Sequence, residues 1–131
     1  MIYVDTSVVL AELLLEVRHP PEAFWNEPLI SSRLLQYETW TRVNARRATE
    51  PDIEATHRLL DRISFIELHA PALQRALTPL PLPVRPLDAL HLATMHFLKQ
   101  QGLPVRLASY DSRLLAAASA MGFETLALGL F

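Results

Sequence analysis

The sequence contains no cysteine. This absence excludes a disulfide framework, a zinc–thiolate site and a cysteine nucleophile. The chain also lacks a long apolar segment: charged residues such as Glu12, Glu16 and Lys99 interrupt its most hydrophobic stretches, whereas a membrane-spanning helix needs about 20 apolar residues. It does not begin like a signal peptide either, since Asp5 breaks the apolar opening at once. We therefore expect a cytoplasmic protein that does not contact a membrane.

An excess of positive charge, which is typical of nucleic-acid-binding domains, is also missing. The chain has 12 Lys and Arg against 14 Asp and Glu, which gives a net charge of −2. Lys99 is the only lysine, and the other cations are arginines, whose planar guanidinium binds phosphate better. Charge alone therefore gives no sign of a nucleic-acid partner, and any such sign has to come from motifs.

Strand-like runs and helical patterns alternate along the 131 residues, half of which are hydrophobic, enough for the core of one domain. The pattern predicts strands at residues 2–5, 64–68, 105–109 and 123–128. It predicts helices at residues 8–16, 22–25, 33–49, 52–62, 72–77, 87–100 and 112–120, with an extended proline-rich connector before residue 86. Crossovers too long for hairpins predict an α/β fold, a three-layer α/β/α arrangement around a central, mainly parallel sheet.

Two aspartates directly follow predicted strands. Asp5 ends the strand at 2–5, and Asp111 comes just after the strand at 105–109. In parallel sheets the carboxyl ends of the strands form the ligand crevice, so both side chains are candidates for a site. Aspartate is also an ordinary helix cap, as are Thr6 and Ser7, so neither aspartate is decisive alone.

Two more acidic residues lie on predicted helices. Asp88 is in the first turn of the helix at 87–100, where the helix dipole stabilises a carboxylate whatever its role. Glu38 lies beside the apolar stripe of the helix at 33–49, and a carboxylate there needs a partner because burying it unpaired is costly. A surface ion pair with Arg42, four residues further on, is the simpler explanation for Glu38.

Four carboxylates gathered at one site would repel one another, so such a cluster needs a cation. Oxygen ligands, with no cysteine and no histidine cluster, favour Mg²⁺ or Mn²⁺ over Zn²⁺. These ions support the hydrolysis of phosphodiester bonds. The four acids that could form such a cluster are Asp5, Glu38, Asp88 and Asp111.

The four acids stand in motifs whose order and spacing resemble the PIN-domain family, and within it the VapC-type toxins. The motifs are Ile2-Tyr3-Val4-Asp5-Thr6-Ser7, Ser32-x-x-Leu35-x-x-Glu38, Asp88-Ala89-Leu90-His91-Leu92-Ala93 and Ser109-Tyr110-Asp111-Ser112-Arg113-Leu114. The resemblance covers essentially the whole chain and implies one PIN-like domain over residues 1–131. It implies a Mg²⁺- or Mn²⁺-dependent endoribonuclease, in which Asp5, Glu38, Asp88 and Asp111 bind the metal and are the catalytic residues for RNA cleavage. Thr6 and Ser109 would orient the carboxylates or bound water.

One position departs from that family pattern. Many members carry a further acidic residue three to five positions after the last aspartate, whereas this chain has Leu114, Leu115 and Ala116 there. We therefore expect one metal ion, or a second ion only together with substrate.

Several other side chains near the acids are assigned provisional roles. Arg42 and Arg46 share a helical face with Glu38 and are predicted to bind RNA, unless they form an ordinary solvated face. Arg85 is a third RNA-binding candidate, which either reaches a phosphate or pins a neighbouring acid. His91 is expected to be a structural, hydrogen-bonding residue.

The resemblance also implies a protein partner. VapC-type toxins are paired with antitoxins whose tail crosses the active-site groove, where an arginine can pair with the carboxylates. The chain carries more large hydrophobic residues than one small core needs, which predicts a partner groove and a homodimer face, unless core burial accounts for them. These residues are Leu10, Leu13, Leu14, Trp25 and Trp40.

Three other classes of protein fit parts of the sequence. A haloacid-dehalogenase-like phosphatase also begins with a strand and an aspartate, but it needs a second carboxylate where this chain has Ser7. A receiver domain needs a lysine near a later strand, whereas Lys99 is on a predicted helix. The remaining alternative is a non-catalytic PIN-like module that binds RNA or protein. The complete set of mutually repelling carboxylates argues against it.

Overall fold

The computed structural model describes residues 1–130 and contains a five-stranded sheet in the order β3-β2-β1-β4-β5. The strands are β1 (Ile2–Val4), β2 (Leu29–Ser32), β3 (Ile63–Ile66), β4 (Arg106–Ala108) and β5 (Glu124–Thr125). Every neighbouring pair is parallel, which confirms the predicted parallel sheet. The central strand β1 aligns Tyr3 with Ile30 on one side and with Leu107 on the other.

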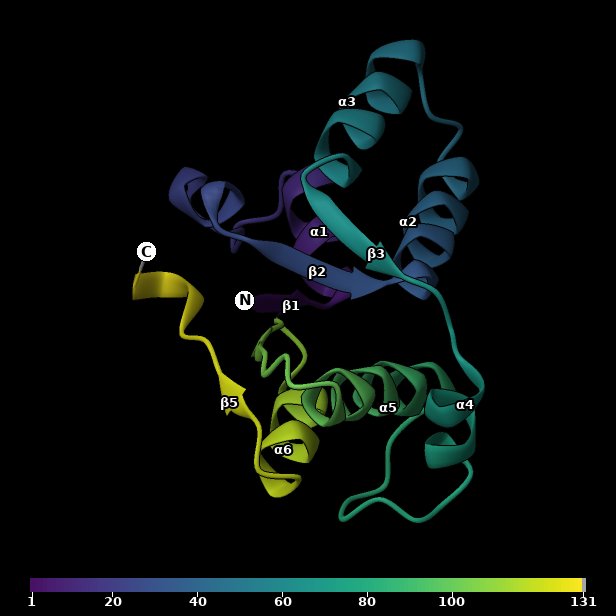
Figure 1. Ribbon diagram of the computed structural model, residues 1–131. Coiled ribbons are helices and arrows are strands. Elements are labelled where there is room, and N and C mark those ends of the chain that lie inside the picture. The colour runs from purple at the N-terminus through teal and green to yellow at the C-terminus, as the bar shows by residue number, and fades with distance from the viewer. Residues whose placement is uncertain (131) are drawn as a thin grey trace.

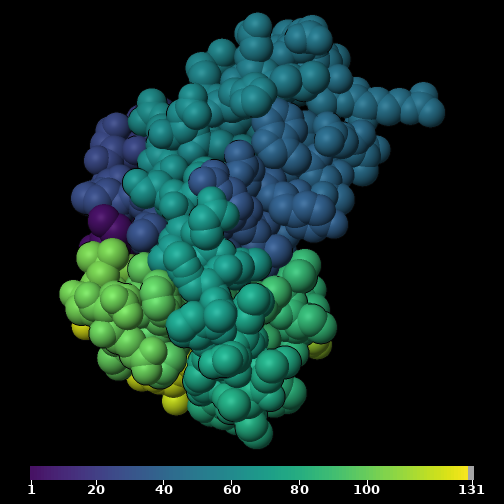
Figure 2. Space-filling view, turned by 45° about the vertical axis from the view of Figure 1, so that its right-hand side comes forward, coloured from purple at the N-terminus to yellow at the C-terminus, as the bar shows by residue number. Residues whose placement is uncertain are grey.

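Helices cover both faces of this sheet (Figure 1). On one face lie α1 (Thr6–Leu13), α2 (Arg33–Ala45) and α3 (Glu50–Leu60), and on the other α4 (Ala70–Ala76), α5 (Pro86–Gln100) and α6 (Ser112–Ala120). Two short 3-10 helices, η1 (Glu22–Asn26) and η2 (Leu128–Leu130), complete the chain. In Figure 2 the teal part of the chain runs from the upper helices down to the lower ones. The predicted three-layer α/β/α arrangement is confirmed.

Two buried clusters lie on opposite faces of the sheet, because successive strand side chains point to opposite sides. Ile2 and Val4 pack with residues of α1 and α2, whereas Tyr3 packs with residues of α5 and α6, such as Leu92 and Leu114. Trp25, which we had considered for a partner surface, is buried in the first cluster. Among the helices of residues 1–130, none has the length and apolar composition that a membrane-spanning segment needs.

Several element boundaries differ from the sequence prediction. The strand β2 was not predicted, because only Leu29 and Ile30 are apolar before the serines that precede α2. The predicted strand 123–128 is reduced to the two residues of β5, which pair with the edge of the sheet. The helix α2 ends at Ala45 rather than at residue 49, since Arg47 adopts a φ of 51°, a left-handed conformation that a helix cannot continue.

Candidate active site

Four acidic residues from four separate elements line one cavity. Asp5 and Asp111 follow the adjacent parallel strands β1 and β4, whose last residues Val4 and Ala108 are paired. Glu38 comes from the second turn of α2, and Asp88 from the first turn of α5. The cavity has a volume of about 650 Å³, and we call it the acidic pocket. Its wall is formed by Asp5, Thr6, Ser7, Leu10, Tyr37, Glu38, Thr41, Arg42, Arg85, Pro86, Leu87, Asp88 and Asp111.

Asp5 is held by hydroxyl groups. Its side chain caps α1, since Oδ2 accepts a weak hydrogen bond from the Ser7 backbone N–H at 3.4 Å. The same oxygen accepts shorter hydrogen bonds from Ser7 Oγ at 2.6 Å and from Ser109 Oγ at 2.8 Å. Asp5 is therefore both a helix cap and a wall of the pocket, so the two interpretations of its position are compatible. Ser109 is predicted to orient a carboxylate, and its hydrogen bond to Asp5 is a contact that such a role requires.

Glu38 is bound by a buried network rather than by Arg42. Its Oε1 accepts a hydrogen bond from Thr6 Oγ1 at 2.9 Å and lies 2.7 Å from His91 Nε2. On the other side of the imidazole ring, Tyr3 Oη lies 2.7 Å from His91 Nδ1. His91 and Tyr3 are both fully buried. The expected hydrogen-bonding His91 is thus present, and it connects the core directly to the pocket.

Arg85 connects the other two acids. Its Nε donates to Asp88 Oδ2 at 3.1 Å, and its Nη2 donates to Asp111 Oδ2 at 2.7 Å. Asp111 Oδ1 meanwhile accepts from the backbone N–H groups of Arg113 and Leu114, which caps α6. Of the two roles considered for Arg85, this contact is the pinning of neighbouring acids.

Burial raises the pKa of Asp88 above its usual value of 3.8, with smaller contributions of the same sign from the charges of Asp5 and Asp111. The hydrogen bond and the charge of Arg85 oppose this rise without cancelling it. The same three aspartates, in turn, raise the pKa of Arg85. Ionisation of Asp88 is therefore less favourable here than in water, even with Arg85 beside it.

Three of the four carboxylates each have one oxygen that accepts no hydrogen bond from residues 1–130. Asp5 Oδ1, Glu38 Oε2 and Asp88 Oδ1 have no hydrogen-bond partner among residues 1–130, although the other oxygen of each carboxylate is bound. Such oxygens, in a wall of carboxylates and hydroxyls without sulfur, are the donors that Mg²⁺ and Mn²⁺ prefer. Within residues 1–130, no three acidic or histidine side chains lie close enough together to hold a metal ion. The chemistry of these oxygens fits a hard divalent cation although their spacing in this structure does not, and Arg85 holds part of the set.

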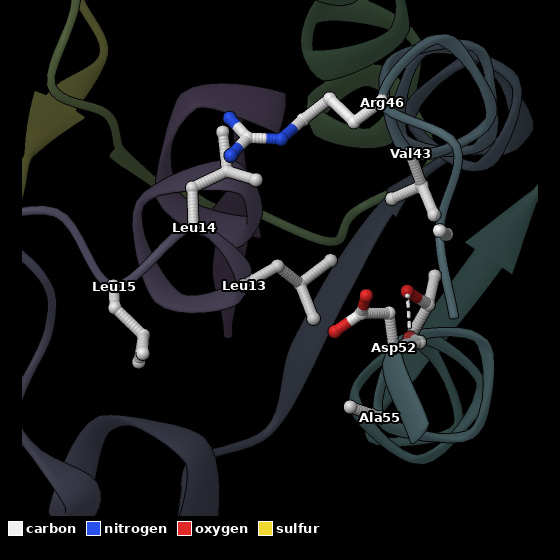
Figure 3. A pocket seen from close by; sticks show the side chains of 9 residues that line it. Leu13, Leu14, Leu15, Val43, Arg46, Asp52 and Ala55 are labelled. Carbon is white, nitrogen blue, oxygen red and sulfur yellow. Dashed lines mark hydrogen bonds between the residues drawn. The ribbon is translucent and has the colours of Figure 1, made fainter. Parts of the chain in front are cut away.

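The arginines predicted to bind RNA are separated by the fold. Arg42 and Arg85 line the acidic pocket. Arg46, one helical turn beyond Arg42, lines a different hollow of about 300 Å³, where Figure 3 shows it beside Leu14, with Leu13 and Asp52 nearby. The spacing of four residues predicts that Arg42 and Arg46 share one face of α2. In the structure, however, Arg42 lines the acidic pocket and Arg46 does not.

Two residues of the network were not singled out by their chemistry in the sequence. Ser7 binds Asp5, accepts the Tyr110 backbone N–H at 2.9 Å and was considered only as a cap. From the sequence, Tyr3 is predicted only as part of a buried strand. Its phenol was a recognisable signal, because a buried hydroxyl needs a hydrogen-bond partner.

Comparisons with known proteins agree on one family. The family model described as "PIN domain" matches residues 2–120. Ribonuclease VapC47 of Mycobacterium tuberculosis is 32% identical, and the match covers 98% of each chain. Ribonuclease VapC35 of the same species is 31% identical over the same share of both chains. The crystal structure of M. tuberculosis VapC20, described as a sarcin–ricin loop cleaving toxin, is similar with a TM-score of 0.69 and 22% identity. The match covers 96% of this chain and 98% of that one, and the likeness shows a common fold.

Proposed function

Because the chain belongs to the PIN-domain family, within its VapC-type branch, we propose that it is a single-domain, divalent-metal-dependent endoribonuclease and the toxin of a toxin–antitoxin pair. The observation that carries the proposal is the acidic pocket. Two of its carboxylates follow β1 and β4 and two lie on α2 and α5, and three of the four keep an oxygen without a hydrogen-bond partner among residues 1–130. The substrate is RNA, and the protein acts where RNA is abundant, in the cytoplasm.

Asp5, Glu38 and Asp88 would hold Mg²⁺ or Mn²⁺, with Asp111 adding charge beside them. A bound ion would supply Lewis acidity for hydrolysis of a phosphodiester bond. In this reaction the oxygen of water bonds to phosphorus, the bond to the leaving ribose oxygen breaks, and a proton from the water ends on that oxygen. Ser7, Ser109 and Thr6 fix the orientation of the carboxylates through the hydrogen bonds described above. Arg42 provides a guanidinium on the pocket wall for a neighbouring phosphate.

The contacts of Arg85 are the one observation that favours the alternative function, a PIN-like module without catalytic activity. A PIN-like module that binds RNA or protein without cutting would keep Asp88 and Asp111 neutralised by Arg85, as the present contacts do. In the enzyme, a cation competes with Arg85 for these carboxylates. Isothermal titration with Mn²⁺ separates the two functions, since only the enzyme binds the ion through Asp5 and Asp88.

Cleavage of a panel of structured RNAs, with the products mapped at their ends, tests the enzymatic proposal. With Mg²⁺ present, Asp5→Asn and Asp88→Asn should abolish cleavage, and chelation with EDTA should abolish it in the unmodified protein. Asp61→Asn is the matched control, because Asp61 is exposed at the end of α3 and does not line the pocket. Cleavage by either pocket variant at the unmodified rate would contradict the proposal.

The partner proposal concerns an antitoxin and a homodimer. Exposed apolar side chains after α1, with Leu15 86% exposed and Val17 fully exposed, offer surface for either contact. Expression of the chain alone should arrest growth, and expression together with its genomic neighbour should restore growth and yield a complex. Harmless expression of a protein that still cuts RNA would instead indicate a housekeeping nuclease. Sedimentation of the purified chain tests the homodimer.

A further inference from the structure

A second hollow adjoins the acidic pocket. It has a volume of about 470 Å³ and is formed where the connector before α5 faces the first turns of α5 and α6. Its wall consists of Leu82, Pro83, Val84, Arg85, Asp88, Arg113 and Ala116. Because Arg85 and Asp88 line both spaces, the hollow and the acidic pocket are adjacent at these two residues. We call the second space the side hollow.

One wall of the side hollow is apolar and rigid. Val84 packs against the buried cluster below the sheet, whereas Leu82 remains 39% exposed. Prolines stand at positions 79, 81 and 83, and each fixes its own φ. The connector therefore has little conformational freedom to lose when a ligand packs on it, which favours binding. An exposed apolar side chain held this way beside a charged pocket suits a flat apolar ligand.

The opposite wall carries a free cation. Arg113 lies in the first turn of α6, and its guanidinium makes no hydrogen bond or ion pair with any other of residues 1–130. Arg85, beside it on the wall, is already engaged with Asp88 and Asp111. A free guanidinium presents a planar set of donors that matches the oxygens of a phosphate.

We propose that the side hollow is a nucleotide subsite that holds an unpaired nucleotide next to the scissile phosphate. The base lies against Leu82, Pro83 and Val84, and its phosphate is bound by Arg113. The inference rests on the proposed nuclease function and assigns residues outside the acidic pocket to RNA binding. A base inserted between these walls cannot remain paired, so the subsite accepts only an unpaired nucleotide.

Fluorescence anisotropy with labelled RNA tests the subsite in EDTA, so that the RNA stays intact. The probes are an eight-nucleotide single strand of mixed sequence and a fully paired duplex of the same length. The unmodified protein should bind the single strand more tightly than the duplex. Ala116→Glu places a longer, acidic side chain in the hollow and should weaken single-strand binding about tenfold, the effect of losing roughly one base contact. Ala120→Glu adds the same charge to an exposed position of α6 outside the hollow and should change binding less than about twofold.

Arg113→Gln provides a second, independent variant. Loss of one phosphate contact should reduce the slope of log affinity against log salt by about 0.7 for a single strand. Arg106→Gln is its control, since Arg106 lines a hollow with Met1 and Lys99 and neither space described above. Melting temperatures of all four variants show whether the fold is kept.

The outcomes separate the subsite from the nuclease function. If the protein cuts RNA but Ala116→Glu and Arg113→Gln behave like their controls, the subsite is wrong and the nuclease function stands. If these variants bind RNA normally but no longer bind the protein encoded beside the gene, the hollow belongs to that protein and the inference is overturned. If the unmodified chain neither binds nor cuts RNA, both proposals fail.

Discussion

At the scale of single residues, a buried chain of hydrogen bonds fixes the position of Glu38. The carboxylate only accepts, so the tautomer of His91 with hydrogen on Nε2 donates to it and accepts at Nδ1 from Tyr3 Oη. Burial raises the pKa of Tyr3 well above its usual value, which keeps the phenol protonated as a donor. The Ser32 backbone N–H completes the chain by donating to Tyr3 Oη at 3.3 Å. Tyr3 and His91 are thus positioning residues for Glu38.

Tyr3→Phe tests this chain, because it keeps the packed ring and removes the hydroxyl. We expect single-turnover RNA cleavage to slow by about tenfold, since His91 loses the contact that orients it toward Glu38. RNA binding in EDTA should be unchanged. The free energy of unfolding in urea should fall by about 1–3 kcal/mol, the cost of an unsatisfied buried polar group. Cleavage at the unmodified rate would show that Glu38 needs no such support.

Asp88→Asn tests the electrostatics of the pocket in the metal-free protein. The pKa of Asp88 is raised in the folded state, so folding favours its protonated form, and this stabilising contribution is lost as the pH rises through that pKa. Asparagine resembles the protonated form at every pH. In EDTA at pH 7 the variant should therefore melt at a temperature equal to or above that of the unmodified protein, and the difference should vanish as the pH falls toward 3.8. A variant that melts lower at pH 7 would mean that the ion pair with Arg85 outweighs the burial of Asp88.

At the scale of elements, caps place the helices that carry the acids. The buried Ser32 caps α2, where its Oγ accepts the Leu34 backbone N–H at 3.1 Å, and Asp5 and Asp111 cap α1 and α6. At α1 and α6, the same carboxylate both caps the start of the helix and lines the acidic pocket. The start of the helix and the position of the site residue are therefore set together.

Ser32→Ala and Thr49→Ala form a matched pair. Each removes a side-chain cap, from α2 and α3 respectively, and should lower the free energy of unfolding by about 1 kcal/mol in urea. Only Ser32→Ala should also slow RNA cleavage, because α2 carries Glu38 and no residue of α3 lines the acidic pocket. Equal cleavage rates in the two variants would show that the start of α2 does not influence the position of Glu38.

At the scale of the whole molecule, the pocket joins segments that are distant in sequence. Its acids lie at positions 5, 38, 88 and 111, on elements that meet only in the folded sheet. An ion held by these residues binds the native state and not the unfolded chain, so it stabilises the entire domain.

Thermal unfolding with and without Mn²⁺ measures this linkage. An ion concentration 100-fold above the dissociation constant should stabilise the unmodified protein by about 2.7 kcal/mol and raise its melting temperature. Asp61→Asn should show the same rise, and Asp5→Asn should show little or none. A rise in Asp5→Asn equal to that of the unmodified protein would place the bound ion outside the acidic pocket.

Two features could be predicted from the sequence alone: the alternation of strands and helices, and the position of Asp5 and Asp111 at one edge of the sheet. Both follow from local rules: the period of apolar residues identifies an element, and the carboxyl ends of parallel strands meet at the same edge. The strand β2 was not predicted because two apolar residues are too few to show a periodic pattern. It is a strand because its backbone pairs with β1 on one side and β3 on the other.

The hydrogen-bond partners of the side chains in the site could not be predicted, because they come from segments that meet only in the folded chain. Arg85 reaches Asp111 across 26 positions, and His91 joins Tyr3 to Glu38 across 88 and 53 positions. Helical spacing placed Arg42 and Arg46 together, yet the packing of α2 against α1 and α3 leaves only Arg42 at the pocket. Residue spacing defines the face of one helix, whereas the neighbour that covers each part of that face depends on contacts between distant segments.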